Sequence, residues 1–145
     1  MKVFCDTNVL VAASERSHPH HAQAWPALHR VATGEDRVFM SSHSIAETYS
    51  TLTRLPLQPR IHPSEAACVI TDNILPNFEV VTIGKKDYLE ALRLVGSGGW
   101  IGAKIYDALL IGCAVRSGAE RIYTFDLSDF AQLAPELEAR ICAPR

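Results

Sequence analysis

Apolar residues along this chain fall into short continuous runs, separated by longer stretches in which apolar positions recur at helical spacing. Strands are predicted for the runs KVFC at 2–5, VFMSS at 38–42, FEVVTI at 78–83 and RIYTF at 121–125, with a last edge strand in ARICAP at 139–144. Strands that are apolar throughout are typical of parallel sheets covered by helices on both faces. The pattern therefore predicts an α/β fold with a central parallel sheet between two helical layers.

Helices are predicted in the segments between these strands. Their expected ranges are 9–14, about 20–31, 43–55, 63–74, 85–95, 104–118 and a short helix within 127–137. Pro56 and Pro59 end the third helix, and Pro63 suits the first turn of the fourth. Gly118 is a suitable residue to end the apolar helix before it. The segment GSGGWIG at 96–102 is expected to be a flexible loop.

Composition and charge narrow the class of protein. The 145 residues, 48% of them hydrophobic and 21% charged, are expected to form one globular domain over 1–145. The net charge of −2 does not indicate a broad basic surface for nucleic acid. The four cysteines lie far apart without a C-x-x-C motif, which argues against a zinc ribbon and favours a reducing compartment. Without a secretory leader or a run of membrane-spanning length, the chain is expected to be cytoplasmic, with no membrane contact.

Four acidic residues are expected to meet at one edge of the sheet. Asp6 directly follows the first predicted strand, Asp126 directly follows RIYTF, and Glu47 comes soon after VFMSS. Asp107 lies near the start of the apolar helix that runs back beside the sheet. The carboxyl ends of parallel strands share one edge, which is where sites form in open α/β sheets.

Each acid also has a local structural alternative, in which it only shapes a turn or a helix end. The alternatives are Asp6 as a helix cap, Glu47 in a capping box with Ser44, Asp107 as the cap of a helix starting at Ala108, Asp126 as a turn residue, and Asp129 as the cap of DFAQL. Capping does not require the acids to gather. Two carboxylates at about 4 Å repel by roughly 4 kcal/mol at an effective dielectric constant near 20.

A divalent cation would remove that repulsion. Mg²⁺ and Mn²⁺ prefer carboxylate oxygens, water and phosphate oxygens as ligands. Such an ion activates a bound water and stabilises in-line displacement at phosphorus. The acids therefore predict a phosphodiester-hydrolysing metal site.

The order of motifs along this chain resembles that of a known protein family. The first strand followed by DTNVL, then SIAE, then YDALLIGCAVRSGAERIYTFDLSDF is similar to PIN-domain ribonucleases, and in particular to the VapC toxins of type II toxin–antitoxin pairs. The resemblance covers essentially the whole chain. It implies a PIN-like three-layer α/β/α sandwich, cleavage of RNA with Mg²⁺ or Mn²⁺, a homodimer, and inhibition by a cognate antitoxin protein.

The resemblance also assigns roles to residues of this sequence. It implies an acidic quartet of Asp6, Glu47, Asp107 and Asp126, in which Asp6 and Asp107 are the principal metal ligands. Glu47 and Asp126 would hold metal-bound waters or a second ion, and a metal-activated water would attack the scissile phosphate. The residues expected to support the acids are Thr7, Asn8 and Thr124.

Two further segments have both a functional and a plain structural interpretation. SHPHH at 17–21 could bind a metal through its histidines, but the absence of a nearby cysteine favours the start of a helix, with a lid over the groove as a further option. In GSGGWIGAK, Trp100 could stack an RNA base or pack in the core or a dimer contact, and Lys104 could contact a phosphate.

Two other classes of phosphate chemistry lack their motifs in this chain. A phosphoryl-receiver domain would need a paired acid after the first strand, and a dehalogenase-type phosphatase would need D-x-D where this chain has D-T-N. The alternatives that remain are a non-toxin PIN nuclease acting in RNA processing or on DNA, and a catalytically silent PIN-fold binding module.

Overall fold

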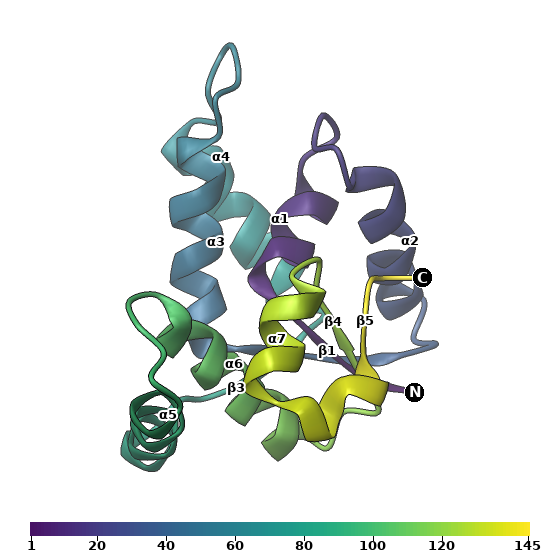
Figure 1. Cartoon of the computed structure of the whole chain (residues 1–145). Coiled ribbons are helices and arrows are strands. Elements are labelled where there is room, and N and C mark those ends of the chain that lie inside the picture. Colours follow the sequence, from purple (N-terminus) through teal and green to yellow (C-terminus); the bar gives the residue numbers. More distant parts are fainter.

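Five parallel strands form the centre of the molecule, which we describe over residues 1–145 from a computed structural model (Figure 1). The strands are β1 (Lys2–Cys5), β2 (Arg37–Ser41), β3 (Glu79–Val81), β4 (Arg121–Tyr123) and β5 (Ile141–Cys142). Their order in the sheet is β3-β2-β1-β4-β5, with every neighbouring pair parallel. Strand β1 is central, and its residues Val3, Phe4 and Cys5 are all buried because helices cover both faces of the sheet.

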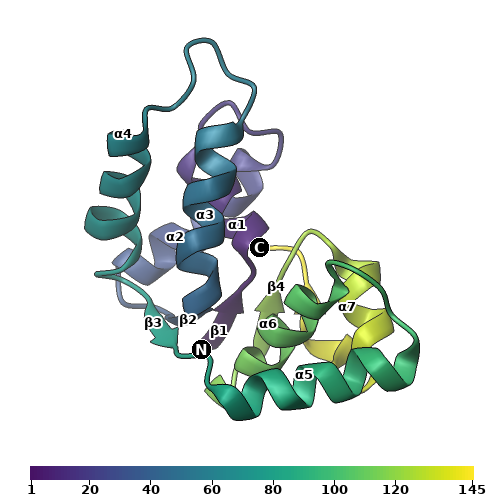
Figure 2. The ribbon, with the colours of Figure 1, turned by 90° about the vertical axis from the view of Figure 1, so that its left-hand side faces the viewer.

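Helices cover both faces of this sheet. They are α1 (Thr7–Ser14), α2 (His21–Ala32), α3 (Ser42–Arg54), α4 (Pro63–Cys68), η1 (Val69–Ile74), α5 (Lys85–Gly98), α6 (Lys104–Ser117), α7 (Leu127–Leu133) and η2 (Pro135–Arg140). Figure 2 shows α1 to α4 gathered on one side and α5 to α7 on the other. None of the helices has the length and apolar character of a membrane span.

Two apolar cores lie on opposite faces of the sheet. Val3 and Cys5 of β1 pack with Leu10 of α1 in one core, whereas Phe4 packs with Leu110 of α6 in the other. Successive side chains of a strand point to opposite faces, so one short apolar strand serves both cores. The predicted α/β class with helices on both faces is confirmed.

Most predicted helices agree with the structure to within two residues, and two differ by more. The helix expected over 63–74 is α-helical only to Cys68 and continues as the π-helix η1. The helix expected over 85–95 runs on to Gly98, so the first part of GSGGWIG is helical and not a flexible loop.

Gly99 ends helix α5 with φ +70°, a conformation that glycine adopts easily. A Cβ at Gly98 would lie 2.5 Å from the Trp100 indole nitrogen, so glycine is needed there for the indole to pack.

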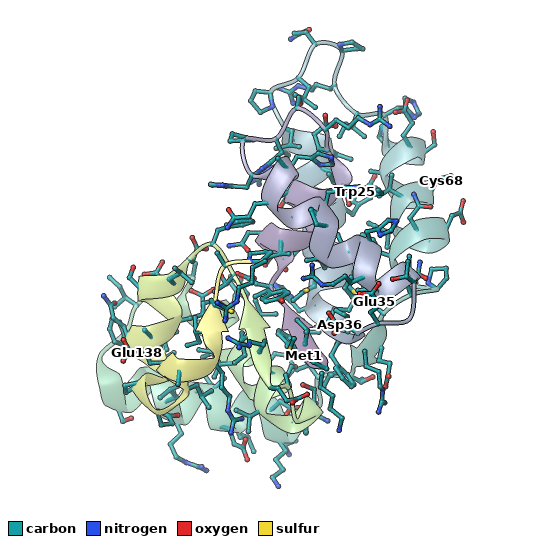
Figure 3. All side chains as sticks on the ribbon, turned by 90° about the vertical axis from the view of Figure 1, so that its right-hand side faces the viewer. Met1, Trp25, Glu35, Asp36, Cys68 and Glu138 are labelled. Atoms are coloured by element: carbon teal, nitrogen blue, oxygen red, sulfur yellow. The ribbon has the colours of Figure 1, made fainter.

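The amino-terminal end of the sheet is fixed by an ion pair. The Met1 amino group lies 3.0 Å from Asp36, which also pairs with Arg30 at 3.3 Å. Met1, Glu35 and Asp36 lie close together in Figure 3. These charges are at the start of β1, whereas Asp6 lies just beyond its carboxyl end. The structure thus separates a charge-paired edge from an edge with an excess of acids.

Candidate active site

The predicted acids lie at the carboxyl edge of the sheet. Asp6 joins β1 to α1 and Asp126 joins β4 to α7, so the neighbouring strands β1 and β4 deliver both carboxylates. Glu47 lies in the second turn of α3, which starts directly after β2. Asp107 lies in the first turn of α6.

A hydrogen-bond network joins Asp6 to Asp126. The Thr124 hydroxyl donates to Asp6 Oδ2 at 2.7 Å and accepts from the Asp126 backbone N–H at 2.9 Å. Asn8 Nδ2 donates to Asp126 Oδ2 at 3.1 Å, and it lies 3.4 Å from Thr124 Oγ1. Asn8 and Thr124 therefore lie against Asp6 and Asp126. Thr7 lies behind them, where its hydroxyl donates to Ser44 Oγ at 2.9 Å.

Burial changes the ionisation of two acids. Asp6 is only 4% exposed, and desolvation is the main cause that raises its pKa from 3.8 to about 7. Asp107 and Asp126 raise it further by repulsion, while the Thr124 hydrogen bond opposes the shift. Desolvation also raises the pKa of Asp107 to about 6, with Lys104 opposing this rise and Asp126 among the carboxylates that add to it. The acids are thus close enough to repel, and the nearby positive charge does not neutralise them.

An open cleft gives access to part of this edge. Its volume is about 350 Å³, and its lining includes Glu47, Asp107, Asp129 and Lys104. The Lys104 ammonium lies 2.6 Å from Asp129 Oδ1 and 5.3 Å from the centre of the Trp100 ring. The indole also packs against the core that contains Leu110. Lys104 is therefore in the cleft with one of its donors engaged, and Trp100 is held between that ammonium and the core.

The donor set fits a hard divalent cation. All four candidate ligands are carboxylates, and burial together with repulsion between carboxylates raises the pKa values of Asp6 and Asp107 despite the nearby Lys104. No group of three histidine, cysteine, aspartate or glutamate side chains lies close enough together to hold one ion in these rotamers. Mg²⁺ commonly uses only one or two carboxylates and completes its octahedron with waters and substrate phosphates. The residues present match that mode of binding.

The helix-capping alternatives do not describe these acids. Asp6 and Asp126 occupy N-cap positions, but neither side chain makes a capping hydrogen bond. Helix α3 is capped by Ser41, whose hydroxyl accepts from the Ser44 N–H at 3.1 Å, so the capping box of Ser44 with Glu47 is wrong. The expected caps at Asp107 and Asp129 are also wrong, because α6 starts at Lys104 and α7 at Leu127.

The histidines of SHPHH contact protein groups. His21 is the first residue of α2, and its Nδ1 atom lies 2.9 Å from the Ala12 carbonyl oxygen of α1. His20 stacks on Phe125, with 4.3 Å between ring centres and 16° between planes. Phe125 precedes Asp126, so this loop packs beside the acidic edge. The helix-start interpretation accounts for these contacts.

Asp129, which lines the cleft, and His43, which contacts the cleft residue Glu47, are outside the predicted set. His43 Nε2 lies 2.9 Å from Glu47 Oε2, and Asp129 binds Lys104 instead of capping a helix. The spacing of four residues between His43 and Glu47 is a signal in the sequence for their contact, since such residues share a helix face. Only the packing of α6 against α7 brings Asp129 to Lys104.

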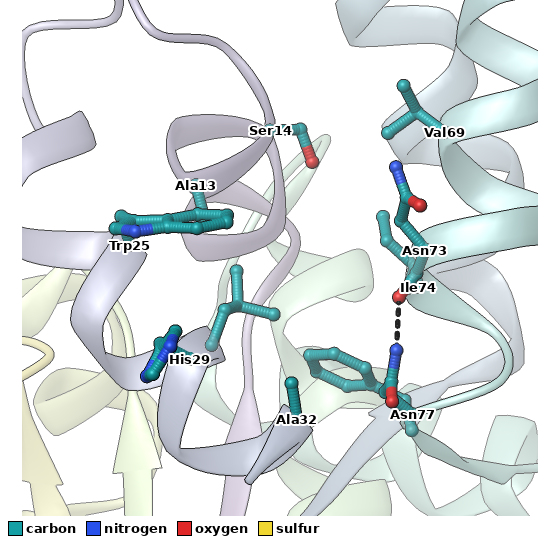
Figure 4. Close-up of a pocket in the computed structure, with 11 residues that line it drawn as sticks. Ala13, Ser14, Trp25, His29, Ala32, Val69, Asn73, Ile74 and Asn77 are labelled. Carbon is teal, nitrogen blue, oxygen red and sulfur yellow. Dashed lines mark hydrogen bonds between the residues drawn. The ribbon is translucent and has the colours of Figure 1, made fainter.

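A second cavity has a different character (Figure 4). Its volume is about 330 Å³, and its lining comes from α1, α2 and η1 with Asn77 and Phe78 after η1. Trp25 and Ala13 face Ile74 and Val69 across it in Figure 4. It contains no carboxylate, and therefore offers no ligand set for a hard cation.

Known proteins share much of this sequence. The PIN domain family matches residues 3–135. Ribonuclease VapC27 of Mycobacterium tuberculosis is 32% identical over 117 residues, which cover 79% of this chain and 78% of that protein. Ribonuclease VapC40 of the same organism is 32% identical over 126 residues, or 84% of each chain.

Solved structures share the fold. Mycobacterium tuberculosis VapC20, described as a toxin that cleaves the sarcin–ricin loop, aligns with a TM-score of 0.67 at 20% identity, over 89% of this chain and 92% of its own. VapBC2 from Rickettsia felis, bound to a DNA fragment from its promoter, aligns with a TM-score of 0.62 at 18% identity. The alignment covers 91% of this chain and 92% of that chain. On this extent of matching sequence, with a parallel sheet that carries acids at its carboxyl edge, the chain belongs to the PIN-domain family and is a relative of the VapC ribonucleases.

Proposed function

We propose that this chain is a divalent-metal-dependent endoribonuclease and the toxin component of a type II toxin–antitoxin pair. The observation that carries the proposal is the gathering of the quartet acids at one sheet edge, in a chain related to VapC ribonucleases. All of residues 1–145 form one PIN domain in this proposal. A binding module of the same fold would gain nothing from carboxylates that repel one another.

The acids have distinct proposed roles. Asp6 and Asp107 are the principal ligands of Mg²⁺ or Mn²⁺, while Glu47 and Asp126 orient metal-bound waters or a second ion. The bound cation supplies Lewis-acid chemistry at the phosphate and a water of lowered pKa. Thr124 and Asn8 fix Asp6 and Asp126 relative to each other through their hydrogen bonds.

RNA is the proposed substrate. Lys104 lies in the cleft beside Asp107, where its remaining donors can contact a phosphate. Trp100 is the proposed contact for a base, with the indole held by Lys104 and the core. Because one structural neighbour is described as cleaving the sarcin–ricin loop, ribosomal RNA belongs among the substrates tested.

The proposed partners are a cognate antitoxin and a second copy of this chain. Support for the antitoxin comes from the toxin–antitoxin pair among the structural neighbours. Exposed apolar side chains on α5, at Tyr88, Leu89 and Leu92, offer a face for a homodimer. The proposed location is the cytoplasm, where a reducing environment keeps the four free cysteines as thiols.

The proposal is tested by incubating purified, antitoxin-free protein with total RNA and ribosomal RNA in Mg²⁺ or Mn²⁺. Wild-type protein is expected to cut RNA at defined sites, and EDTA and the Asp107→Asn variant are each expected to abolish cutting. A folded wild-type protein that leaves every RNA intact in either metal would contradict the nuclease proposal and favour the binding module.

Expression in a bacterial host separates a toxin from a processing nuclease. A toxin arrests growth, and co-expression of the small protein encoded next to it relieves the arrest. Normal growth with active, metal-dependent nuclease in the extract would contradict the toxin role and favour a PIN nuclease in RNA processing.

A further inference from the structure

His43 lies beside Glu47 in the first part of helix α3. Its Nε2 atom is 2.9 Å from Glu47 Oε2, and the two residues are four positions apart, which places them on one face of the helix. The side chains are 28% and 33% exposed, so both are partly removed from water. His43 can therefore fix the carboxylate of an acid of the quartet.

The other contact of the His43 ring crosses to a different helix. His43 stacks on Tyr106 of α6, with 5.1 Å between ring centres and an interplanar angle of 6°. Tyr106 directly precedes Asp107, and it lines the acidic cleft together with Glu47. A single imidazole ring thus contacts one acid of the quartet and the immediate neighbour of another.

We propose that His43 is a positioning residue that aims the Glu47 carboxylate into the metal-binding cleft, while Tyr106 holds the imidazole ring in place. The inference rests on the proposed metal-dependent function, and it assigns a role to the stacked pair of His43 and Tyr106. His43 donates from Nε2–H to Glu47, a bond that the neutral imidazole makes in its Nε2–H tautomer.

The physical reason lies in the freedom of the glutamate side chain. An isolated Glu47 has several rotamers, and all but one are lost when the carboxylate engages a metal-bound water or a second ion. A hydrogen bond from a fixed donor selects one rotamer before the ion arrives. Partners of this kind behind a metal ligand typically change metal affinity or activity by about 10- to 100-fold when they are removed. An exposed pair without a second contact would have little effect of this kind.

Direct binding of Mn²⁺ tests the inference without RNA. Affinity is measured by calorimetry and by electron paramagnetic resonance for the wild type, His43→Ala, Glu47→Gln and the double variant. His43→Ala is expected to weaken Mn²⁺ binding by about 10-fold or more. In the Glu47→Gln background the same change is expected to have no further effect, because its target carboxylate is gone.

Conservative variants separate positioning from general damage to the fold. Tyr106→Phe keeps the stacked ring and is expected to bind Mn²⁺ as the wild type does, whereas Tyr106→Ala weakens binding by about 2- to 10-fold. His43→Gln, which can still donate to Glu47, is expected to recover part of the affinity lost in His43→Ala. His29→Ala, in the apolar cavity, is the matched control and is expected to leave affinity unchanged.

The outcomes keep this inference separate from the proposed nuclease function. Wild-type Mn²⁺ affinity in His43→Ala, an equal loss in both Glu47 backgrounds, or no Mn²⁺ binding by the wild type would each overturn the positioning role. Mn²⁺ binding that follows the expected order, in a protein that cuts no RNA, would support the role of His43 and contradict the nuclease proposal alone.

Discussion

The acidic cleft and the apolar cavity are similar in volume, about 350 and 330 Å³, and opposite in chemistry. The cleft is lined by Glu47, Asp107 and Asp129, and it lies between helices at the carboxyl edge of the sheet. The cavity is lined mainly by apolar side chains of α1, α2 and η1. Cavity size therefore does not locate the chemistry of this protein. What marks the proposed site is the concentration of carboxylates at one edge of the sheet, where burial raises the pKa values of Asp6 and Asp107.

The two regions also differ in what their residues do for the fold. Ile74 and Phe78 in the apolar cavity belong to the hydrophobic core, so they stabilise the folded state. Asp6 at the acidic edge opposes folding when it is ionised, because its charge is buried near other carboxylates. The residues of the apolar cavity therefore stabilise the folded state, whereas the ionised carboxylate at the acidic edge destabilises it. Single substitutions on each side can test this contrast.

The largest expected effect is on RNA cleavage. Asp107→Asn removes a proposed metal ligand without changing side-chain size, and it should lower the cleavage rate by at least about 1,000-fold. Asn73→Ala changes a polar side chain of the apolar cavity and should leave the rate within about twofold. Rates are compared at matched concentrations of protein shown to be folded by circular dichroism. Equal losses in the two variants would break the distinction between the regions.

The next effect concerns stability and pH in the absence of metal. The pKa of Asp6 is about 7 in the folded protein and near 3.8 when unfolded, so between these values the folded state binds more protons. Asp6 therefore makes its full contribution to the free energy of unfolding below about pH 4. This contribution is lost as pH rises through about 7, and the total loss is on the order of 4 kcal/mol.

Urea unfolding from pH 4 to pH 8 in EDTA measures this dependence. Asp6→Asn should flatten the profile and be more stable than the wild type at pH 8, and Mn²⁺ should restore stability to the wild type only. A wild-type profile that rises through this pH range in parallel with that of Asp6→Asn would show that the buried carboxylate is stabilised by other groups.

On the other side of the comparison, Ile74→Ala should lower the free energy of unfolding by about 3 kcal/mol. Ile74 is 3% exposed, and its removal enlarges an existing cavity. Cleavage per folded molecule should stay at the wild-type level, and Mn²⁺ should bind with unchanged affinity. Chemical denaturation and a metal titration on the same sample measure both quantities. A loss of metal affinity larger than tenfold would mean that the two regions are coupled through α1.

The smallest expected effect is at the pair formed by Lys104 and Asp129. Lys104→Met removes a positive charge that lowers the pKa of Asp107, so this pKa should rise further. The Asp129 side chain is 47% exposed, and breaking the pair should change stability by less than about 1 kcal/mol. Carboxyl titration by NMR follows Asp107 directly. A fall in its pKa would show that Lys104 acts on Asp107 through the geometry of the cleft instead of its charge.

Much of the fold could be predicted from the alternation of short apolar strands with amphipathic helices. The strand at 2–5 and the helix at 104–118 were clear, because their apolar spacing and the terminating Gly118 agree with one another. The extension of α5 to Gly98 could not be predicted in this way. Glycine disfavours helix locally, and only the packing of Trp100 over Gly98 makes it the required residue.

The candidate site, like the fold, could be predicted from the sequence only in part. Sequence motifs indicated Asp6, Glu47, Asp107 and Asp126, and the strand order explains why they share an edge. The capping alternatives for Asp107 and Asp129 are wrong, because α6 starts at Lys104, as its apolar spacing predicted, and α7 starts at Leu127. The contact of His43 with Tyr106 joins residues from different helices, and no local rule predicts it.

The sequence by itself determined the class of fold and the family and predicted the acidic quartet, because these follow from periodicity and from the order of short motifs. Only the tertiary structure decided which acids are desolvated, that Asn8 and Thr124 join Asp6 to Asp126, and that His43 spans two acid-bearing helices. Periodicity reports which face of an element is buried. Distances between side chains depend on how separate elements pack, and this information becomes available only when the chain is folded.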